Sequence, residues 1–177
     1  MTTPTPSPTR WAERPPQDWA VIAAWGTLAA ALPSAVWRLL MIAGMLPGTE
    51  ALRRLHEGEG GYVLGLSVTQ VLAAVLVVGL VRPWGERFAG IDINRWVPVV
   101  LGTLGGIVMT WLFTISMVLG LLQGQRPDQG SVHDGALVLM VIAYAPMLLF
   151  GPMTLLATAG YALRRTSPVT GSRSVRQ

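Results

Sequence analysis

Four long apolar runs constrain this chain more than any other feature. They cover residues 19–46, 62–81, 97–122 and 136–163. A helix rises about 1.5 Å per residue, so about 20 apolar residues match the roughly 30 Å hydrocarbon core of a bilayer. Lipid offers the backbone no hydrogen bonds, so a few isolated runs can cross it only as helices. The runs therefore predict an all-α membrane protein with four transmembrane helices.

Charged residues are scarce and lie mainly between the runs. They make up 12% of the 177 residues, while hydrophobic residues make up 51%. Soluble domains hold about 25% charged residues, so most of this chain is not built for water. The chain has no cysteine, which excludes disulfides, thiolate nucleophiles and Cys-ligated metals.

The chain is basic, with a pI near 10.6, and the placement of its arginines indicates the partner. They flank the apolar runs, which is the distribution that anionic lipid headgroups favour. In a nucleic-acid-binding protein the arginines would instead cluster on one water-exposed surface. We therefore expect the lipid bilayer as partner, and no nucleic acid.

Arginine counts also predict the orientation. If the four runs cross the membrane in turn, nine arginines fall on one side of the membrane and three on the other. The nine are Arg10, Arg14, Arg82, Arg87, Arg95, Arg164, Arg165, Arg173 and Arg176; the three are Arg53, Arg54 and Arg126. Trp11, Trp19, Trp84 and Trp96 fall at the boundary of the arginine-rich side, where indoles collect. We expect a multi-pass protein of the cell membrane with both termini cytoplasmic.

The segments outside residues 19–163, the predicted four-helix transmembrane domain, are polar. Residues 1–18 are rich in Pro, Ser and Thr, which predicts a disordered cytoplasmic leader. This leader is not a cleavable signal, because the first apolar run begins only at Trp19 and is long enough to span. Residues 164–177 form a basic cytoplasmic tail.

Small residues predict where the helices pack, since apolar side chains gain little by leaving lipid for one another. Gly102 and Gly106 form a GxxxG pair in the third run, and Thr103 and Thr110 fall near the same stripe. This pattern predicts a close helix contact. Prolines in the first and fourth runs predict kinks.

Arg38 is the one ionisable residue well inside a run. At a helix centre an arginine costs about 2.5 to 3.5 kcal/mol on insertion scales, so it should snorkel outward, face the bundle or bind a partner. No carboxylate lies inside any run to pair with it. We therefore single out Arg38, with Gln70 of the second run, as candidate ligand-binding residues; a hydrogen-bonded packing role is the alternative.

Both histidines lie on the predicted outer side, and an acidic residue follows each, as His56-Glu57 and His133-Asp134. Imidazoles with carboxylates are able to ligate Zn²⁺. Neither histidine has a second one three or four residues away, and solvated loop polarity explains both pairs. We expect no metal and no other cofactor.

Three segments are similar to a known group of proteins. PSAVWRLLMIAGMLPG (33–48), VRPWGERF (81–88) and RWVPV (95–99) resemble small multi-span membrane proteins common in actinobacteria. The resemblance covers roughly residues 19–100 and implies a polytopic membrane protein. It carries over no activity or catalytic residues. AGIDIN (89–94) differs from the group as an insertion.

These patterns leave three functional hypotheses open. The first is a non-enzymatic structural or accessory component of a larger membrane assembly, or a small homo-oligomer. The second is binding or permeation of a small molecule or ion through a polar cavity near Arg38, which requires Arg38 to face inward. The third is a membrane enzyme with an external metal site at His56 and His133.

Overall fold

The computed structural model describes residues 15–56, 58–82, 87–88, 91–92, 94, 96–125 and 132–166. Within these residues the regular secondary structure is helical apart from one pair of two-residue strands. Four helices are long and apolar enough to cross a membrane: Asp18–Ile42, Gly60–Gly79, Trp96–Leu122 and Gly135–Arg165. The prediction of an all-helical fold with four such helices is confirmed at this level. Most of the predicted leader and tail lies outside the described residues.

The third and fourth spans each consist of three segments. In chain order the elements are α1 (Asp18–Ile42), α2 (Glu50–Leu55), α3 (Gly60–Gly79), β1 (Arg87–Phe88), β2 (Ile91–Asp92), α4 (Trp96–Met109), the π-helical η3 (Thr110–Ile115), α5 (Ser116–Leu122), α6 (Asp134–Tyr144), the 3₁₀-helical η4 (Ala145–Leu149) and α7 (Phe150–Thr166). The strands pair antiparallel, with Arg87 opposite Asp92.

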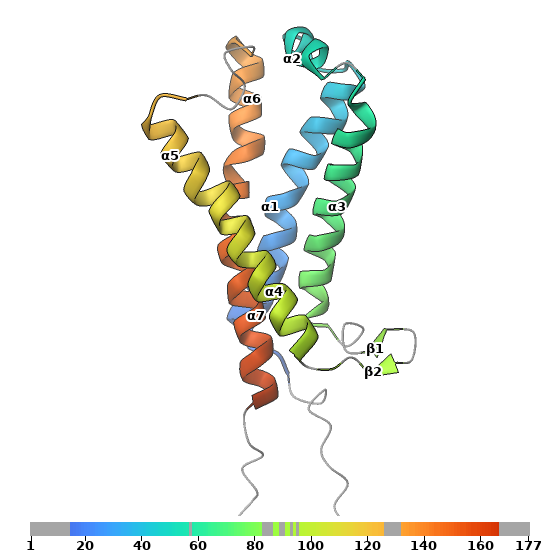
Figure 1. Ribbon diagram of the computed structural model, residues 1–177, viewed down its shortest axis with the longest axis vertical. Coiled ribbons are helices and arrows are strands. Elements are labelled where there is room, and N and C mark those ends of the chain that lie inside the picture. Colours follow the sequence, from blue (N-terminus) through green and yellow to red (C-terminus); the bar gives the residue numbers. More distant parts are fainter. Residues whose placement is uncertain are drawn as a thin grey trace, which may run out of the picture.

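The long helices run along one axis, with α1 packed between α3 and α7 (Figure 1). The continuous helix of α4, η3 and α5 crosses in front of α7 and leans away from the bundle (Figure 1). We call the end that carries α2 the α2 end, and the end that carries β1 and β2 the β end. The start of α1 and the end of α7 lie at the β end (Figure 1).

The first helix ends at Ile42, four residues before the end of the predicted run. Gly44 has a φ of 70°, the left-handed conformation that glycine adopts without steric cost. Its N–H donates to the Met41 carbonyl, and the Met45 N–H donates to the Leu40 carbonyl, both at 3.0 Å. This pair of hydrogen bonds is a Schellman motif, which satisfies the last carbonyls of a helix and ends it.

The half of the bundle near the β end is held together by small side chains. Ala20, Ala23 and Ala24 of α1 are buried in one cluster with Ala157 of α7. Gly160 of α7 has no room for a Cβ, because the Ala20 side chain occupies that space. In lipid, where burial of apolar surface from water contributes little, helices associate through van der Waals contacts, and small residues allow the close approach that these contacts need.

The GxxxG pair also lies at a helix contact. Gly102 faces Thr158 of α7, and a Cβ on Gly106 would lie 2.6 Å from Leu155 Cδ2. The Thr110 Oγ1 donates to the Gly106 carbonyl at 2.7 Å. Thr103 is half-buried on the same helix. The glycines therefore let α4 approach α7 closely.

The two irregular segments meet halfway along the third and fourth spans. The Thr114 Oγ1 of η3 donates to the Leu148 carbonyl of η4 at 2.6 Å, and the Thr110 backbone fills the space beside Gly151. Pro146 lies at the start of η4, where its missing N–H disrupts the α-helical pattern. Pro33, by contrast, lies inside an unbroken α1.

Candidate ligand-binding site

Arg38 is buried, with 7% of its surface exposed. Its Nε–H donates to the Tyr144 hydroxyl at 3.1 Å, and Nη1 donates to Gln70 Oε1 at 2.7 Å. The guanidinium also lies 5.5 Å from the centre of the Tyr144 ring. Arg38 is about 6 Å along the axis from the end of α1, while its partners Gln70 and Tyr144 lie about 15 Å from the α2-end starts of their helices. The side chain therefore reaches inward from the α2 end.

Gln70 is held in one orientation. Its Nε2 donates to the Ala31 carbonyl at 3.0 Å and to Ser34 Oγ at 2.9 Å, and contacts Met147 Sδ at 3.1 Å. These partners are acceptors, so the amide nitrogen points toward the Ala31 carbonyl and Ser34, and the amide oxygen points toward the Arg38 guanidinium. The guanidinium is therefore fixed by hydrogen bonds to α3 and α6.

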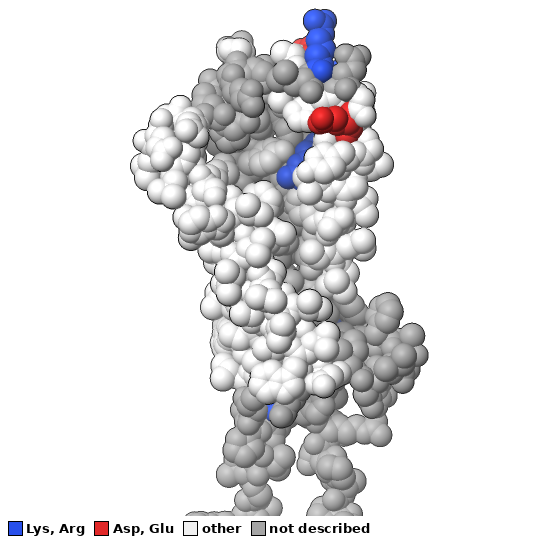
Figure 2. All heavy atoms as spheres, viewed as in Figure 1, with Lys and Arg blue, Asp and Glu red and all other residues white. Residues whose placement is uncertain are grey.

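A cavity of about 700 Å³ lies beside this network, with Arg38 and Tyr144 in its wall. We call it the Arg38 cavity. Figure 2 shows a hollow at the α2 end of the molecule, with basic side-chain atoms inside it and acidic atoms beside it. Small-molecule sites commonly measure about 300 to 1,000 Å³, so the cavity is large enough for an organic ligand.

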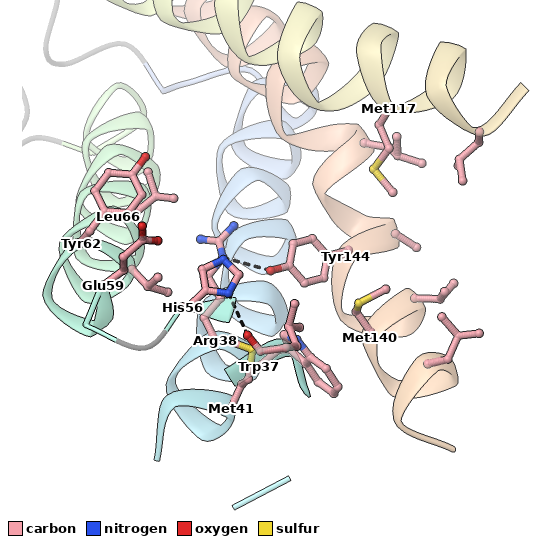
Figure 3. Close-up of a pocket in the computed structure, with 17 residues that line it drawn as sticks. Trp37, Arg38, Met41, His56, Glu59, Tyr62, Leu66, Met117, Met140 and Tyr144 are labelled. Carbon is pink, nitrogen blue, oxygen red and sulfur yellow. Dashed lines mark hydrogen bonds between the residues drawn. The ribbon is translucent and has the colours of Figure 1, made fainter. Parts of the chain in front are cut away.

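The wall of the Arg38 cavity is mainly apolar. α3 contributes Leu66, α5 contributes Met117 and α6 contributes Met140. In Figure 3 Arg38 lies between Glu59 and Tyr62 on one side and Tyr144 and Met140 on the other. The polar groups thus form a small cluster in an apolar surround, which is the usual composition of a small-molecule site.

The charge of Arg38 has only neutral partners among the described residues. Its contacts are those with Gln70 and Tyr144, and no described carboxylate forms an ion pair with it. Glu59 lines the same cavity, but its side chain is exposed near the α2 end. The cavity therefore contains a buried positive charge without a described counter-ion.

The chain matches no protein-family model, no curated protein and no solved structure. Any function must therefore be argued from the residues of the chain itself.

The structure places the other predicted ligands apart. His56 lines the Arg38 cavity, and its Nδ1–H donates to the Leu52 carbonyl at 2.9 Å. His133 lines a separate cavity of about 410 Å³. Glu57 and the side chain of Asp134 lie outside the described residues. In the described part of the chain, no group of three or more His, Cys, Asp or Glu is placed to hold a metal.

Sequence reasoning missed Tyr144 and Ser34, which complete the network around Arg38 and Gln70. A signal for Tyr144 was present, because a tyrosine in the middle of an apolar run needs a partner for its hydroxyl. Ser34 gave no such signal, since a helical serine usually bonds its own backbone, as Ser34 does to the Ala31 carbonyl at 3.1 Å.

Proposed function

We propose that this chain is an integral protein of the cell membrane that binds a small molecule in the Arg38 cavity and performs no chemistry on it. The observation that carries the proposal is the direction of Arg38. Its side chain is buried and lines a cavity of about 700 Å³. An ionisable group at membrane depth that faces a cavity is most often part of a ligand or ion site.

We further propose that the α2 end faces the outside and that both termini are cytoplasmic. The count of nine arginines against three supports this orientation. Trp19 and Trp96 lie at the β end with 41% and 58% of their surfaces exposed, as interfacial indoles do. In this orientation the Arg38 cavity is reached from the outer side.

Binding fits the cavity better than permeation does. Met147 and Phe150 are buried in a cluster with Ala31 and Ala74, and Met147 contacts Gln70 at 3.1 Å. A further cavity of about 310 Å³, lined by α3 and α4 residues and by Phe150, lies toward the β end. A solute would have to displace this apolar layer to pass from one cavity to the other.

A structural role in a larger membrane assembly, or in a homo-oligomer, is the second candidate. The third span favours it, because only 6% of its most apolar stretch is buried, against 44% for the first span. Lipid alone also covers such a surface. The chain has no cysteine, so a single cysteine at Leu112, which is 52% exposed, gives a direct test. Cross-linking to a second subunit in native membranes would support assembly.

The binding proposal is tested by filling the cavity. The thermal midpoint of the full chain in neutral-lipid nanodiscs is measured with dodecyl phosphate, dodecanol or dodecyltrimethylammonium, because a ligand of the folded state raises it. We expect at least one probe to raise the midpoint, and Leu66→Trp to abolish the rise by occupying the cavity. Leu72→Trp, at an exposed position of the same helix outside the cavity lining, is the matched control. A rise that Leu66→Trp leaves unchanged for every probe contradicts the proposal.

A further inference from the structure

We infer that the ligand of the Arg38 cavity is an amphipathic anion, with an apolar body and one carboxylate or phosphate group that binds Arg38 and Tyr144. This inference rests on the proposed small-molecule function and names the chemistry of the ligand.

Arg38 and Tyr144 present hydrogen-bond donors at the cavity wall. A guanidinium has five N–H groups, and two of those on Arg38 are used by Tyr144 and Gln70, which leaves three. The Tyr144 hydroxyl accepts from Arg38, and its own proton has no described acceptor. A carboxylate or phosphate oxygen accepts several hydrogen bonds at once, and arginine binds such groups in a bidentate manner.

The position of the charge also favours an anion. Arg38 is buried inside the bundle, where an unpaired cation is costly, and its described partners are neutral. Gln70 cannot turn its amide to bring a different atom to the guanidinium, because its nitrogen is bonded to α1. The network therefore orients the charge without neutralising it. A bound anion would supply the missing charge.

The walls indicate an apolar body. Leu66, Met117 and Leu148 line the cavity from three different elements, and methionine adapts to apolar ligands of varied shape. A small inorganic anion would leave these walls in contact with water or lipid. A molecule with an acyl or aromatic body fills the cavity while its anionic group reaches Arg38.

Glu59 is the described carboxylate that could serve as counter-ion to Arg38 in place of a bound anion, because it lines the same cavity. Its substitution separates the two cases. If Glu59 is not part of the anion site, Glu59→Gln leaves dodecyl phosphate binding unchanged or strengthens it, because a negative charge is removed. Tighter binding of dodecyltrimethylammonium than of dodecyl phosphate, lost by about tenfold or more in Glu59→Gln, would show that the cavity selects a cation through Glu59 and would overturn the inference.

The direct test compares probes that share a dodecyl chain and differ in charge. The full chain in phosphatidylcholine nanodiscs is titrated with dodecyl phosphate, dodecanol and dodecyltrimethylammonium, and binding is followed by the thermal midpoint. We expect dodecyl phosphate to bind most tightly, and Arg38→Gln to weaken it by about tenfold or more. Arg82→Gln, which removes an exposed arginine beside Trp25, should leave it unchanged.

Two further arms keep the test decisive. Should Arg38→Gln fail to fold, Tyr144→Phe retains the ring and loses only the hydroxyl, and is expected to weaken dodecyl phosphate binding by about fivefold. Nanodiscs that contain phosphatidylglycerol separate the sources of the anion. An Arg38-dependent rise of the midpoint with that lipid alone identifies a lipid headgroup, whereas a rise with dodecyl phosphate alone identifies a free amphiphile.

The outcomes distinguish the inference from the function on which it rests. Equal binding of all three dodecyl probes, abolished by Leu66→Trp and unaffected by Arg38→Gln, would overturn the anionic ligand and leave small-molecule binding in place. If Leu66→Trp changes the binding of no probe, both are wrong.

Discussion

The two halves of the bundle are built from different side chains, and they differ in how closely the helices approach. Toward the β end, Ala20, Ala24 and Ala157 are at most 1% exposed and bring α1 against α7. Toward the α2 end, α1 instead presents Trp37 and Arg38 to the cavity wall. Small residues close the helices together, and large or charged ones keep them apart. The cavity lies where α1 makes this change and where the third span leans away from the bundle (Figure 1).

The largest expected effect comes from enlarging a residue in the closely packed half. We expect Gly160→Leu to lower the free energy of unfolding by about 3 kcal/mol, because added atoms in a filled space force the helices apart. The Ala20 side chain already occupies the position of a Cβ at Gly160. Reversible unfolding in mixed detergent micelles measures the change.

Gly65→Leu is the matched control for that substitution. Gly65 lies on α3 in the half near the α2 end, and nothing lies within 4 Å of the position of its Cβ. The unfolding free energy of this variant should be unchanged or slightly raised, because leucine favours the helix more than glycine does by about 0.5 to 1 kcal/mol. Equal losses at Gly160 and Gly65 would contradict the contrast between the halves.

The stability of the half near the α2 end, which contains the Arg38 cavity, depends on its polar network. Gln70→Leu removes the acceptor at 2.7 Å from Arg38 Nη1 and the donor to the Ala31 carbonyl. We expect a loss of about 2 kcal/mol in unfolding free energy, since a buried charged donor is left without its partner. Thr69→Leu, at the exposed neighbouring position, should have little effect. A Gln70→Leu protein as stable as the parent would show that Arg38 does not need this anchor.

The smallest effect is expected where the halves meet. Thr114→Val removes the 2.6 Å hydrogen bond between η3 and the Leu148 carbonyl, and we expect it to cost about 1 kcal/mol, as interhelical hydrogen bonds in membranes do. Thr103→Val on the same span serves as control, since Thr103 has no described hydrogen bond. Both variants are compared by their thermal midpoints. A larger fall in the thermal midpoint for Thr103→Val than for Thr114→Val would contradict a stabilising role for the hydrogen bond between Thr114 and the Leu148 carbonyl.

The sequence predicted the helices well because their cause is local. Backbone groups in apolar runs must bond within the run, so length and composition were enough to find four of them. The end of α1 was misplaced, because the apolar residues continue to Leu46 whereas the left-handed Gly44 ends the helix through local backbone hydrogen bonds. The π-helical turn at Thr110–Ile115 has no sequence pattern that distinguishes it from α-helix.

The site was predictable only in part. Arg38 and Gln70 were each conspicuous as polar residues in apolar runs, but the rotation of one helix against another decides whether they meet. Tyr144 reaches them across 106 positions of the sequence, and the cavity exists because the third span leans away from the bundle. Neither the rotation nor the lean is encoded by hydrophobic periodicity within a single segment.

The central claim is that a cavity around Arg38 opens to the outside and holds an anion. It is tested most directly by a single cysteine at Met140, which lines the cavity and is 8% exposed, reacted in intact cells with a membrane-impermeant sulfonate thiol reagent. We predict that Met140→Cys reacts from outside, that dodecyl phosphate slows the reaction, and that Arg38→Gln removes this protection. A cysteine at this position that reacts only after the cells are opened, or not at all, would contradict the account.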